Sequence, residues 1–366
     1  MHLSPSQAAW FRLRRSGLIT PFPSPEAAAS ALVGIQAQVI PPAGLSLWNR
    51  TQGLHLDAFH DRLYTRRSLV KLWGQRGTLH LYPSAEWPLY YAAFKALKTW
   101  WERRLAREGG DQNALRDAVQ RVAALMQQGG LFSRKDLRAV DPDLDQWLST
   151  ANGLVMELVR DALVCHAQPS GSQSRFAHRM VWLPDLAWHP PSTDDACLEL
   201  ARRFFSAYGP ASTQDLAYWF GATVAQARRW TDALTAEIVE VHLEGRPCWA
   251  RPQDLDDLAV APPPRASWPT RLLYRFDPLL LALKDKTWLI DPAHYKRVWR
   301  EAAIVEAVLL VGGRIEGTWR YKRSAKGLSI SIAPFSPLAS PVRDALEEQA
   351  AGVAAFFGLP LLGFDG

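Results

Sequence analysis

The sequence lacks the marks of membrane, secreted and disulfide-stabilised proteins. No run of about 18 apolar residues occurs, and the opening residues, MHLSPSQAAWFRLRRSGL, have no apolar secretory core. Three cysteines, Cys165, Cys197 and Cys248, are odd in number and widely spaced, which argues against a disulfide framework and a zinc knuckle. We therefore expect a cytoplasmic protein in a reducing compartment.

The common catalytic signatures are also missing. There is no Gly-rich phosphate loop, no Gly-x-Ser-x-Gly elbow, no His-Glu-x-x-His and no Cys-x-x-Cys. The nine histidines are scattered without the spacing of metal ligands. We expect no metal, no nucleotide cofactor and no other cofactor, and the usual dinucleotide and hydrolase classes are disfavoured.

Positive charge is concentrated in two parts of the chain. Lys and Arg outnumber Asp and Glu in residues 1–110 and 265–326, whereas acidic residues predominate in 111–264. If folding brings the two basic parts together, they form one surface suited to phosphates, with the acidic middle as scaffold. The alternative is two solvated faces that bind no partner.

The length of 366 residues predicts several packed modules rather than one core. Residues 194–258 read as three helices and a short hairpin, which is the order of a winged helix-turn-helix. The same order recurs over residues 113–183 and, more loosely, over 5–83. A helix within 84–112 is expected to link the first two units.

The last third of the chain changes character after a proline-rich boundary at 259–269. Within 265–335 the sequence predicts short strands, with a tight hairpin turn at Gly312-Gly313, and a final amphipathic helix spans 338–358. The runs that predict strands are RLLYRF, TWLI, IVEAVLLV, RIEGTWRY and LSISIAP. The predicted fold class is α+β, with tandem winged-helix units followed by a small antiparallel β-barrel-like domain.

Two glutamines, Gln36 and Gln38, stand shortly before two prolines in GIQAQVIPPAGLSLWNRT. On a continuous helix, residues two apart point in nearly opposite directions. We expect Pro41 to force Ile40 out of the helical region, so that the last turn opens and both amides face one side. The alternative is an ordinary surface or capping pair at a helix end.

The surroundings of the glutamine pair resemble a known family. LRRSGL, LVGIQAQ followed by Leu-x-Leu-Trp-x-Arg, and KLWGQRGTLHLYP resemble the winged-helix DNA glycosylase family typified by AlkZ. The later segments FDPLLLALKDKTWLIDPAHYKRVW and VGGRIEGTW also look like that family. The resemblance covers nearly the whole chain.

The resemblance implies three tandem winged helices and a β-barrel-like domain around a DNA-sized cleft. It implies hydrolysis of the N-glycosidic bond of alkylated purines, including interstrand crosslinks. The family's catalytic Gln-apolar-Gln motif falls on Gln36, Ala37 and Gln38. The implied partner is double-stranded DNA with alkylated bases, and the implied enzyme is a monofunctional glycosylase. We expect it to be a monomer, to have no membrane partner and to associate with the nucleoid when it is bound to DNA.

Further candidates for DNA contact follow from charge and position. His80 either reaches the cleft wall or is a core histidine between Leu79 and Leu81. Arg50 and Arg76 are either phosphate ligands or ion-pair partners. A third group lies on and beyond the Gly312-Gly313 hairpin and either follows a phosphate backbone or is a solvated edge: Arg314, Arg320, Lys322, Arg323 and Lys326.

Two other classes of function remain open on the sequence. The winged-helix units alone are compatible with a non-enzymatic transcription regulator, although the middle units are acidic and only Arg228 and Arg229 suit a groove. Such units also serve as scaffolds that bind protein rather than DNA. We favour the glycosylase because the glutamine pair lies within its matching context.

Overall fold

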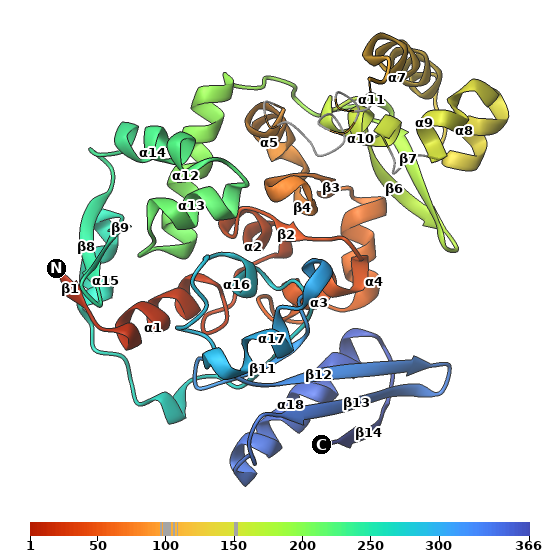
Figure 1. Ribbon diagram of the computed structural model, residues 1–366. Helices are drawn as coiled ribbons and strands as arrows, with labels where there is room; N and C mark the ends of the chain where they lie inside the picture. Colours follow the sequence, from red (N-terminus) through yellow and green to blue (C-terminus); the bar gives the residue numbers. More distant parts are fainter. Residues whose placement is uncertain (96, 98–103, 105–106, 108, 150–152) are drawn as a thin grey trace. The chain divides into compact units, whose positions relative to one another are not determined.

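The computed structural model describes residues 1–95, 97, 104, 107, 109–149 and 153–366 (Figure 1). The chain forms two compact units. Unit 1 comprises residues 1–59 and 201–366, and unit 2 comprises residues 60–200. Unit 1 is therefore built from both ends of the sequence, and unit 2 is a continuous middle segment.

The N-terminal part of unit 1 is mostly helical. Its elements are β1 (His2–Leu3), α1 (Pro5–Arg15), α2 (Pro25–Ala31), β2 (Ile35–Gln36), α3 (Ile40–Trp48) and α4 (Leu56–His60), the last of which ends at the border with unit 2. Helices α1 and α2 begin where the sequence places strong caps, since the hydroxyls of Ser4 and Ser24 accept hydrogen bonds from backbone N–H groups in the first turn.

The chain between α2 and α3 departs from our expectation. Helix α2 ends at Ala31, because Val33 and Gly34 have positive φ values of 55° and 99° and turn the chain out of the helix. The chain thus leaves the helix before the glutamine pair, earlier than we predicted. The expectation that Pro41 forces Ile40 out of the helical region is wrong, because the prolines lie in the first turn of α3, where a missing N–H costs no hydrogen bond.

The second part of unit 1 begins with three helices and a hairpin. These are α12 (Thr193–Tyr208), which enters the unit at residue 201, α13 (Thr213–Phe220), α14 (Val224–Ala233), β8 (Val239–Leu243) and β9 (Arg246–Ala250), followed by α15 (Leu255–Ala259). Strand β8 pairs antiparallel with β9 and parallel with β1. The predicted element order is present, and its interpretation as a winged helix stays a prediction.

The C-terminal sheet is open rather than barrel-like. It has the order β10 (Arg271–Leu273), β11 (Val308–Val311), β12 (Arg314–Ser324), β13 (Gly327–Pro334) and β14 (Leu361–Asp365) (Figure 1). Helix α18 (Ser340–Phe356) connects β13 to β14, so β14 returns parallel to β13. In the part of the chain that the structure describes, β10 and β14 remain edges of the sheet, which corrects the predicted barrel.

Two finer predictions for this sheet have opposite outcomes. The tight turn at Gly312-Gly313 is confirmed, with φ values of 55° and 77° joining β11 to β12. The run TWLI is a turn rather than a strand, because Leu289 and Ile290 both donate backbone hydrogen bonds to the carbonyl of Lys286. Two short helices, α16 (Pro278–Leu281) and α17 (Tyr295–Val298), lie in the same connection.

Unit 2 contains two small groups of strands with helices. Strands β3 (Leu69–Trp73) and β4 (Leu79–Pro83) pair antiparallel and lead into α5 (Trp87–Phe94). Strands β5 (Phe132–Ser133), β7 (Gln173–His178) and β6 (Val164–Ser170) form the second group. The other helices are α7 (Gln112–Gln127), α8 (Arg134–Val140), α9 (Asp145–Ser149), α10 (Gly153–Arg160) and α11 (Arg179–Trp182). The predicted linking helix falls partly on residues 96, 98–103, 105–106 and 108, outside the described residues.

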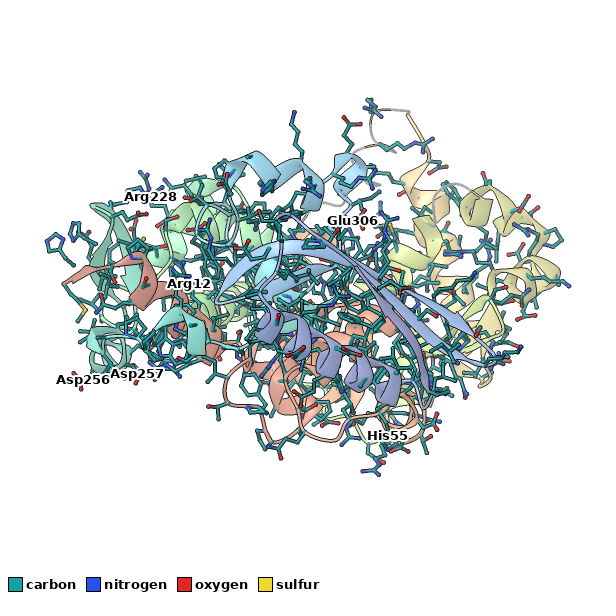
Figure 2. All side chains as sticks on the ribbon, turned by 90° about the horizontal axis from the view of Figure 1, so that it is seen from below. Arg12, His55, Arg228, Asp256, Asp257 and Glu306 are labelled. Atoms are coloured by element: carbon teal, nitrogen blue, oxygen red, sulfur yellow. The ribbon has the colours of Figure 1, made fainter. Side chains whose placement is uncertain are left out.

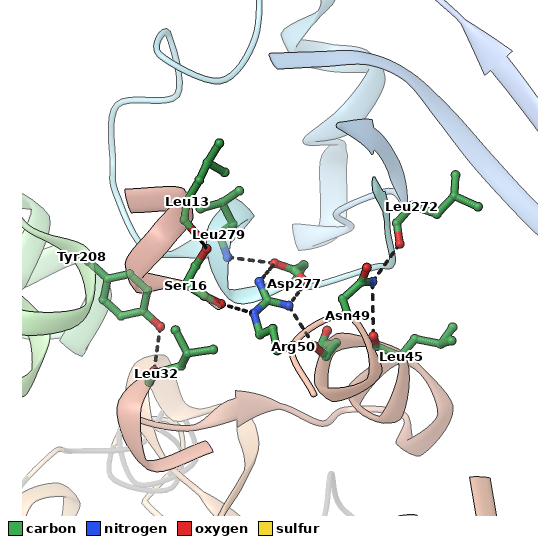
Figure 3. A network of polar contacts seen from close by, with 11 residues as sticks. Leu13, Ser16, Leu32, Leu45, Asn49, Arg50, Tyr208, Leu272, Asp277 and Leu279 are labelled. Atoms are coloured by element: carbon green, nitrogen blue, oxygen red, sulfur yellow. Dashed lines mark hydrogen bonds and ion pairs between the residues drawn. The ribbon is translucent and has the colours of Figure 1, made fainter. Parts of the chain in front are cut away.

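A buried ion pair joins the two ends of the sequence within unit 1 (Figure 3). Arg50, just after α3, forms a two-pronged pair with Asp277, in which both N···O distances are 2.7 Å and both side chains are fully buried. The same guanidinium donates to the carbonyls of Ser16 at 2.8 Å and Ser46 at 2.9 Å. Four donated hydrogen bonds therefore fix α1 and α3 against the segment that precedes α16.

Apolar packing reinforces this connection. Leu13 and Leu18, in and just after α1, share one hydrophobic core with Leu273, Val308 and Ile315 of the C-terminal sheet. Helix α3 approaches α18 closely, since a Cβ on Gly44 would lie 2.8 Å from a ring atom of Phe356. The N-terminal helices and the C-terminal sheet are consequently parts of one core.

We predict that Asp277→Asn destabilises the protein by about 3–5 kcal/mol, because it leaves the Arg50 guanidinium buried without a counter-charge. Urea-induced unfolding measures the change. The control is Asp344→Asn, which removes an exposed carboxylate from α18 and should alter the free energy of unfolding by less than about 0.5 kcal/mol. A cost below about 1 kcal/mol for Asp277→Asn would show that the pair does not hold unit 1 together.

Candidate active site

The glutamine pair lies on extended chain between α2 and α3. Ile35 and Ala37 are fully buried, Gln36 is 8% exposed, and Gln38 is exposed. Successive side chains of an extended strand point to opposite faces. Strand β2 ends at Gln36 and the chain bends at Gln38, so this alternation does not extend to the second amide. Gln36 therefore occupies a largely buried position, and Gln38 lies at the surface.

The turn before the pair is held by a long-range hydrogen bond. The Tyr208 hydroxyl, at the end of α12, donates to the carbonyl of Leu32 at 2.6 Å (Figure 3). Tyr208 is 4% exposed and Leu32 is fully buried, so this bond is shielded from water. It fixes the backbone four residues before Gln36.

Unit 2 carries two further candidates in and beside the β3–β4 connection. Arg76 is half-buried and adopts a left-handed conformation, with φ of 58°. His80 is 1% exposed, and its Nδ1 lies 3.0 Å from the carbonyl of Thr78. A carbonyl only accepts, so Nδ1 carries the proton and the ring is in the Nδ1–H tautomer. Burial, with the nearby charge of Arg76, lowers the pKa of His80 to about 3.

This connection is rigidly packed. The Tyr82 hydroxyl donates to the side-chain oxygen of Gln75, and the Tyr82 ring stacks on Tyr90 with centroids 3.7 Å apart. Gly74 has no room for a side chain, since a Cβ there would lie 1.7 Å from the Tyr82 oxygen. The interpretation of His80 as a core histidine agrees with this burial. A role in DNA contact remains a proposal, and it would require a hydrogen bond from the neutral imidazole ring.

Arg50 must be removed from the set of phosphate ligands. Its side chain is fully buried and its guanidinium is bound to Asp277 and to two backbone carbonyls. A phosphate has no access to it. Of the two alternatives that the sequence left open for Arg50, the structure has the ion pair, but in the core rather than at the surface, because the partner Asp277 is distant in the sequence.

The basic residues of β12 and of the β12–β13 turn do not form a single cluster. Arg314, at the start of β12, donates to the carbonyls of Thr287 at 2.9 Å and Trp288 at 3.4 Å, so it stabilises the turn that replaces the predicted TWLI strand. Lys322 is eight residues further along the extended strand, at a distance of about 26 Å. Arg314 is therefore separated from the other basic residues.

The remaining basic residues gather toward the far end of the β12–β13 hairpin. Arg320 and Lys322 are exposed and alternate with Trp319 and Tyr321, which lie on the opposite face of β12. Arg323, also exposed, lies over the Phe357 ring at 5.6 Å. Lys326 is exposed in the turn. Figure 1 shows β12 and β13 side by side as long strands.

Sequence analysis missed one ionisable group near His80. Lys71, on β3, is half-buried, and burial lowers its pKa to about 8. It pairs in register with Leu81, the residue after His80. The sequence does carry a signal for Lys71, because it is the charged residue within the apolar run SLVKLW. How deeply Lys71 is buried depends on tertiary packing.

Two searches of the described part of the chain bear on other classes. Residues 1–95, 97, 104, 107, 109–149 and 153–366 contain no group of three or more His, Cys, Asp or Glu side chains arranged to hold a metal ion. In the same ranges, every helix is too short or too polar to cross a bilayer.

Comparison with known proteins identifies the family. A family model described as "DNA glycosylase AlkZ-like" matches residues 29–356. The chain is 26% identical over 352 residues to the "Interstrand DNA cross-link repair glycosylase" of Streptomyces sahachiroi, covering 93% of this chain and 92% of that protein. It also matches the solved structure of the Streptomyces sahachiroi DNA glycosylase AlkZ with a TM-score of 0.83 and 25% identity, covering 100% of this chain and 99% of the other.

The fold and these matches define an enzyme of the DNA glycosylase class. Within that class, the chain belongs to the AlkZ-like family. The resemblance inferred from the glutamine motif and its surroundings is thereby confirmed at the level of the family.

We predict that His80 stays neutral in the Nδ1–H tautomer down to about pH 4, as seen by the ¹⁵N chemical shifts of its ring. Its folded-state pKa of about 3 lies below the ordinary value of 6.5, so His80 contributes stability above pH 6.5 that is lost as the pH falls toward 3. Arg76→Gln should raise the pKa of His80 by removing a nearby positive charge. Titration of His80 near pH 6.5 would contradict the burial described here.

Proposed function

We propose that this DNA glycosylase hydrolyses the N-glycosidic bond of alkylated purines of the N7-alkylguanine type, with Gln36 and Gln38 as its catalytic residues. The observation that carries the proposal is the position of both amides in the short segment between α2 and α3, whose backbone Tyr208 holds before the pair and the prolines of α3 hold after it. Gln36 is the more buried amide and Gln38 the more exposed one.

The chemistry suits amides because the leaving group is already activated. Alkylation at N7 makes guanine cationic, so the C1′–N9 bond breaks with its electron pair neutralising the base, and no acid is required. A water oxygen then bonds to C1′ and releases a proton to solvent. Amide oxygens that accept hydrogen bonds from this water orient it, and their dipoles stabilise the positive charge that develops on the sugar.

Interstrand crosslinks are a second proposed substrate. The Streptomyces sahachiroi relative is named a cross-link repair glycosylase. A purine crosslinked through N7 carries the same positive charge as N7-methylguanine, so the same bond breaks for the same reason. Both proposed substrates therefore require only the amide pair and no metal or cofactor.

The DNA-binding surface is proposed to include the β12–β13 hairpin, through Arg320, Lys322, Arg323 and Lys326. All four are exposed, and the strand geometry places Arg320 and Lys322 on one face. Exposed cations on a projecting hairpin suit phosphates or a minor groove. Arg76 and His80 are proposed as secondary contacts, with His80 acting as a neutral hydrogen-bonding group.

The winged-helix units at 5–83, 113–183 and 194–258 are proposed as the scaffold that holds duplex DNA. The three helices and hairpin from α12 to β9 support this interpretation for the last unit. We propose a monomeric enzyme, since one chain supplies both the glutamine pair and the basic hairpin. Its proposed location is the cytoplasm, at the nucleoid when bound.

We predict that Gln36→Ala and Gln38→Ala each lower the single-turnover rate of N7-methylguanine release from duplex DNA about a hundredfold, because each removes one oriented dipole. Release of the free base, measured by chromatography, tests this. The matched control is Gln120→Ala, which removes an exposed amide from α7 and should leave the rate unchanged. Wild-type release at the spontaneous rate from methylated and crosslinked DNA would reject the substrate assignment.

We predict that Lys322→Ala weakens binding of duplex DNA equally for all sequences and reduces the slope of log K against log salt by about 1, because one phosphate contact is lost. Arg320→Ala should act in the same way. Fluorescence anisotropy over a series of salt concentrations measures the slope. Arg343→Ala on α18 is the control. Equal slopes for wild type and Lys322→Ala would exclude this hairpin from the phosphate contacts.

A further inference from the structure

Unit 1 contains a cavity of about 560 Å³ that the proposed reaction does not use. Its walls come from α1, the start of α13, the β8–β9 turn and the chain between α16 and β11. It lies within one compact unit, and neither Gln36 nor Gln38 lines it. Cavities of roughly 300–1,000 Å³ are typical of sites for small molecules.

Arg12, labelled in Figure 2, lies on α1 and lines this cavity. Its side chain is only 5% exposed, and its Nη2 donates to the carbonyl of Pro210 at 2.5 Å. The guanidinium also lies 4.9 Å from the ring centroid of Trp288. Within the described ranges of the chain, Nη1 makes no hydrogen bond or ion pair, and the buried Nε has no partner.

The acidic groups nearest to Arg12 are occupied by other donors. Asp215 accepts from the backbone N–H of Ser212 at 3.0 Å and from that of Lys284 at 2.8 Å. Asp285 accepts from the backbone N–H of Thr287 at 2.9 Å and forms an ion pair with Arg246 at 3.2 Å. Neither carboxylate forms an ion pair with Arg12, so its charge is balanced only through space.

The electrostatics of Arg12 agree with this geometry. Burial lowers the pKa of the guanidinium to about 10, and Asp215 and Asp285 offset part of that effect. The group is still a cation at neutral pH. A buried cation without a contacting counter-charge is costly, and an anion that enters the cavity and pairs with it relieves that cost.

The other walls favour an apolar, flat ligand. Leu243, Pro247 and Leu283 present aliphatic surface, and Trp288 presents an indole ring. The indole N–H of Trp288 is buried and has no hydrogen-bond partner in the chain as described. The rest of the lining carries two cations, Arg246 and Lys284, and three carboxylates, Asp215, Glu244 and Asp285. Arg12 is the most buried of these charged groups, so it is the one that gains most from a contacting counter-charge.

We propose that this cavity binds a small organic anion, with a carboxylate or phosphate monoester that accepts a hydrogen bond from Nη1 of Arg12 and a flat apolar body packed against Trp288 and Leu283. The two anionic groups share the chemistry that a guanidinium recognises. This inference goes beyond the proposed glycosylase reaction and does not depend on it.

Isothermal titration calorimetry of the full chain with benzoate, phenyl phosphate and the neutral benzamide tests the proposal. At least one anion should bind tenfold or more tightly than benzamide, and comparison of the two anions identifies the preferred group. Arg12→Met should remove this preference, whereas Arg14→Met, a matched change two residues along α1, should preserve it. Equal affinities for all three compounds, or no binding by either anion, would overturn the proposal.

A second variant keeps the test valid if Arg12→Met fails to fold. Leu243 is half-buried and lines the cavity, so Leu243→Trp fills the space and leaves Arg12 in place. This variant should lower the affinity for the preferred anion at least tenfold. Unchanged affinity would place the anion elsewhere and overturn the assignment. Release of N7-methylguanine by the same variant, measured without anion, distinguishes this result from a failure of the proposed catalytic function.

Discussion

The structure of unit 1 depends on one buried ion pair. Arg50 and Asp277 are 227 residues apart in the sequence, yet they meet where neither touches water, and the same guanidinium binds the carbonyls of Ser16 and Ser46. Removal of either partner would leave an uncompensated charge in the core. The ion pair therefore makes the N-terminal helices and the C-terminal sheet mutually dependent. It also fixes the end of α3, the helix that begins just after the two glutamines.

The glutamine segment is constrained from both sides. Tyr208 binds the carbonyl of Leu32 before it, and the prolines in the first turn of α3 fix the chain after it. Between these points Ile35, Gln36 and Ala37 are buried and Gln38 is exposed, so the segment is packed along most of its length. The catalytic role that we propose for the amides requires such a fixed backbone, because an amide acts only through the direction of its dipole.

Ionisable groups in this protein have two distinct environments. Arg320 and Lys322 stand in water on the long hairpin, where they can exchange counterions for phosphates. Arg12, Lys71 and His80 are held in walls or core, and burial lowers the pKa of each. The first environment suits long-range attraction of a polyanion. The second suits selective contact with a single group, as we propose for Arg12.

The sequence by itself determined the local features and the family. Ser24 and Ser212 cap helices, Gly312-Gly313 makes a turn, and the glutamine motif with its neighbours points to AlkZ-like glycosylases, because these signals act over a few residues. Tertiary structure alone decided that Arg50 is buried, that TWLI turns, that β14 joins in parallel and leaves the sheet open, and that His80 is neutral. Burial and charge depend on groups distant in sequence, which no local pattern contains.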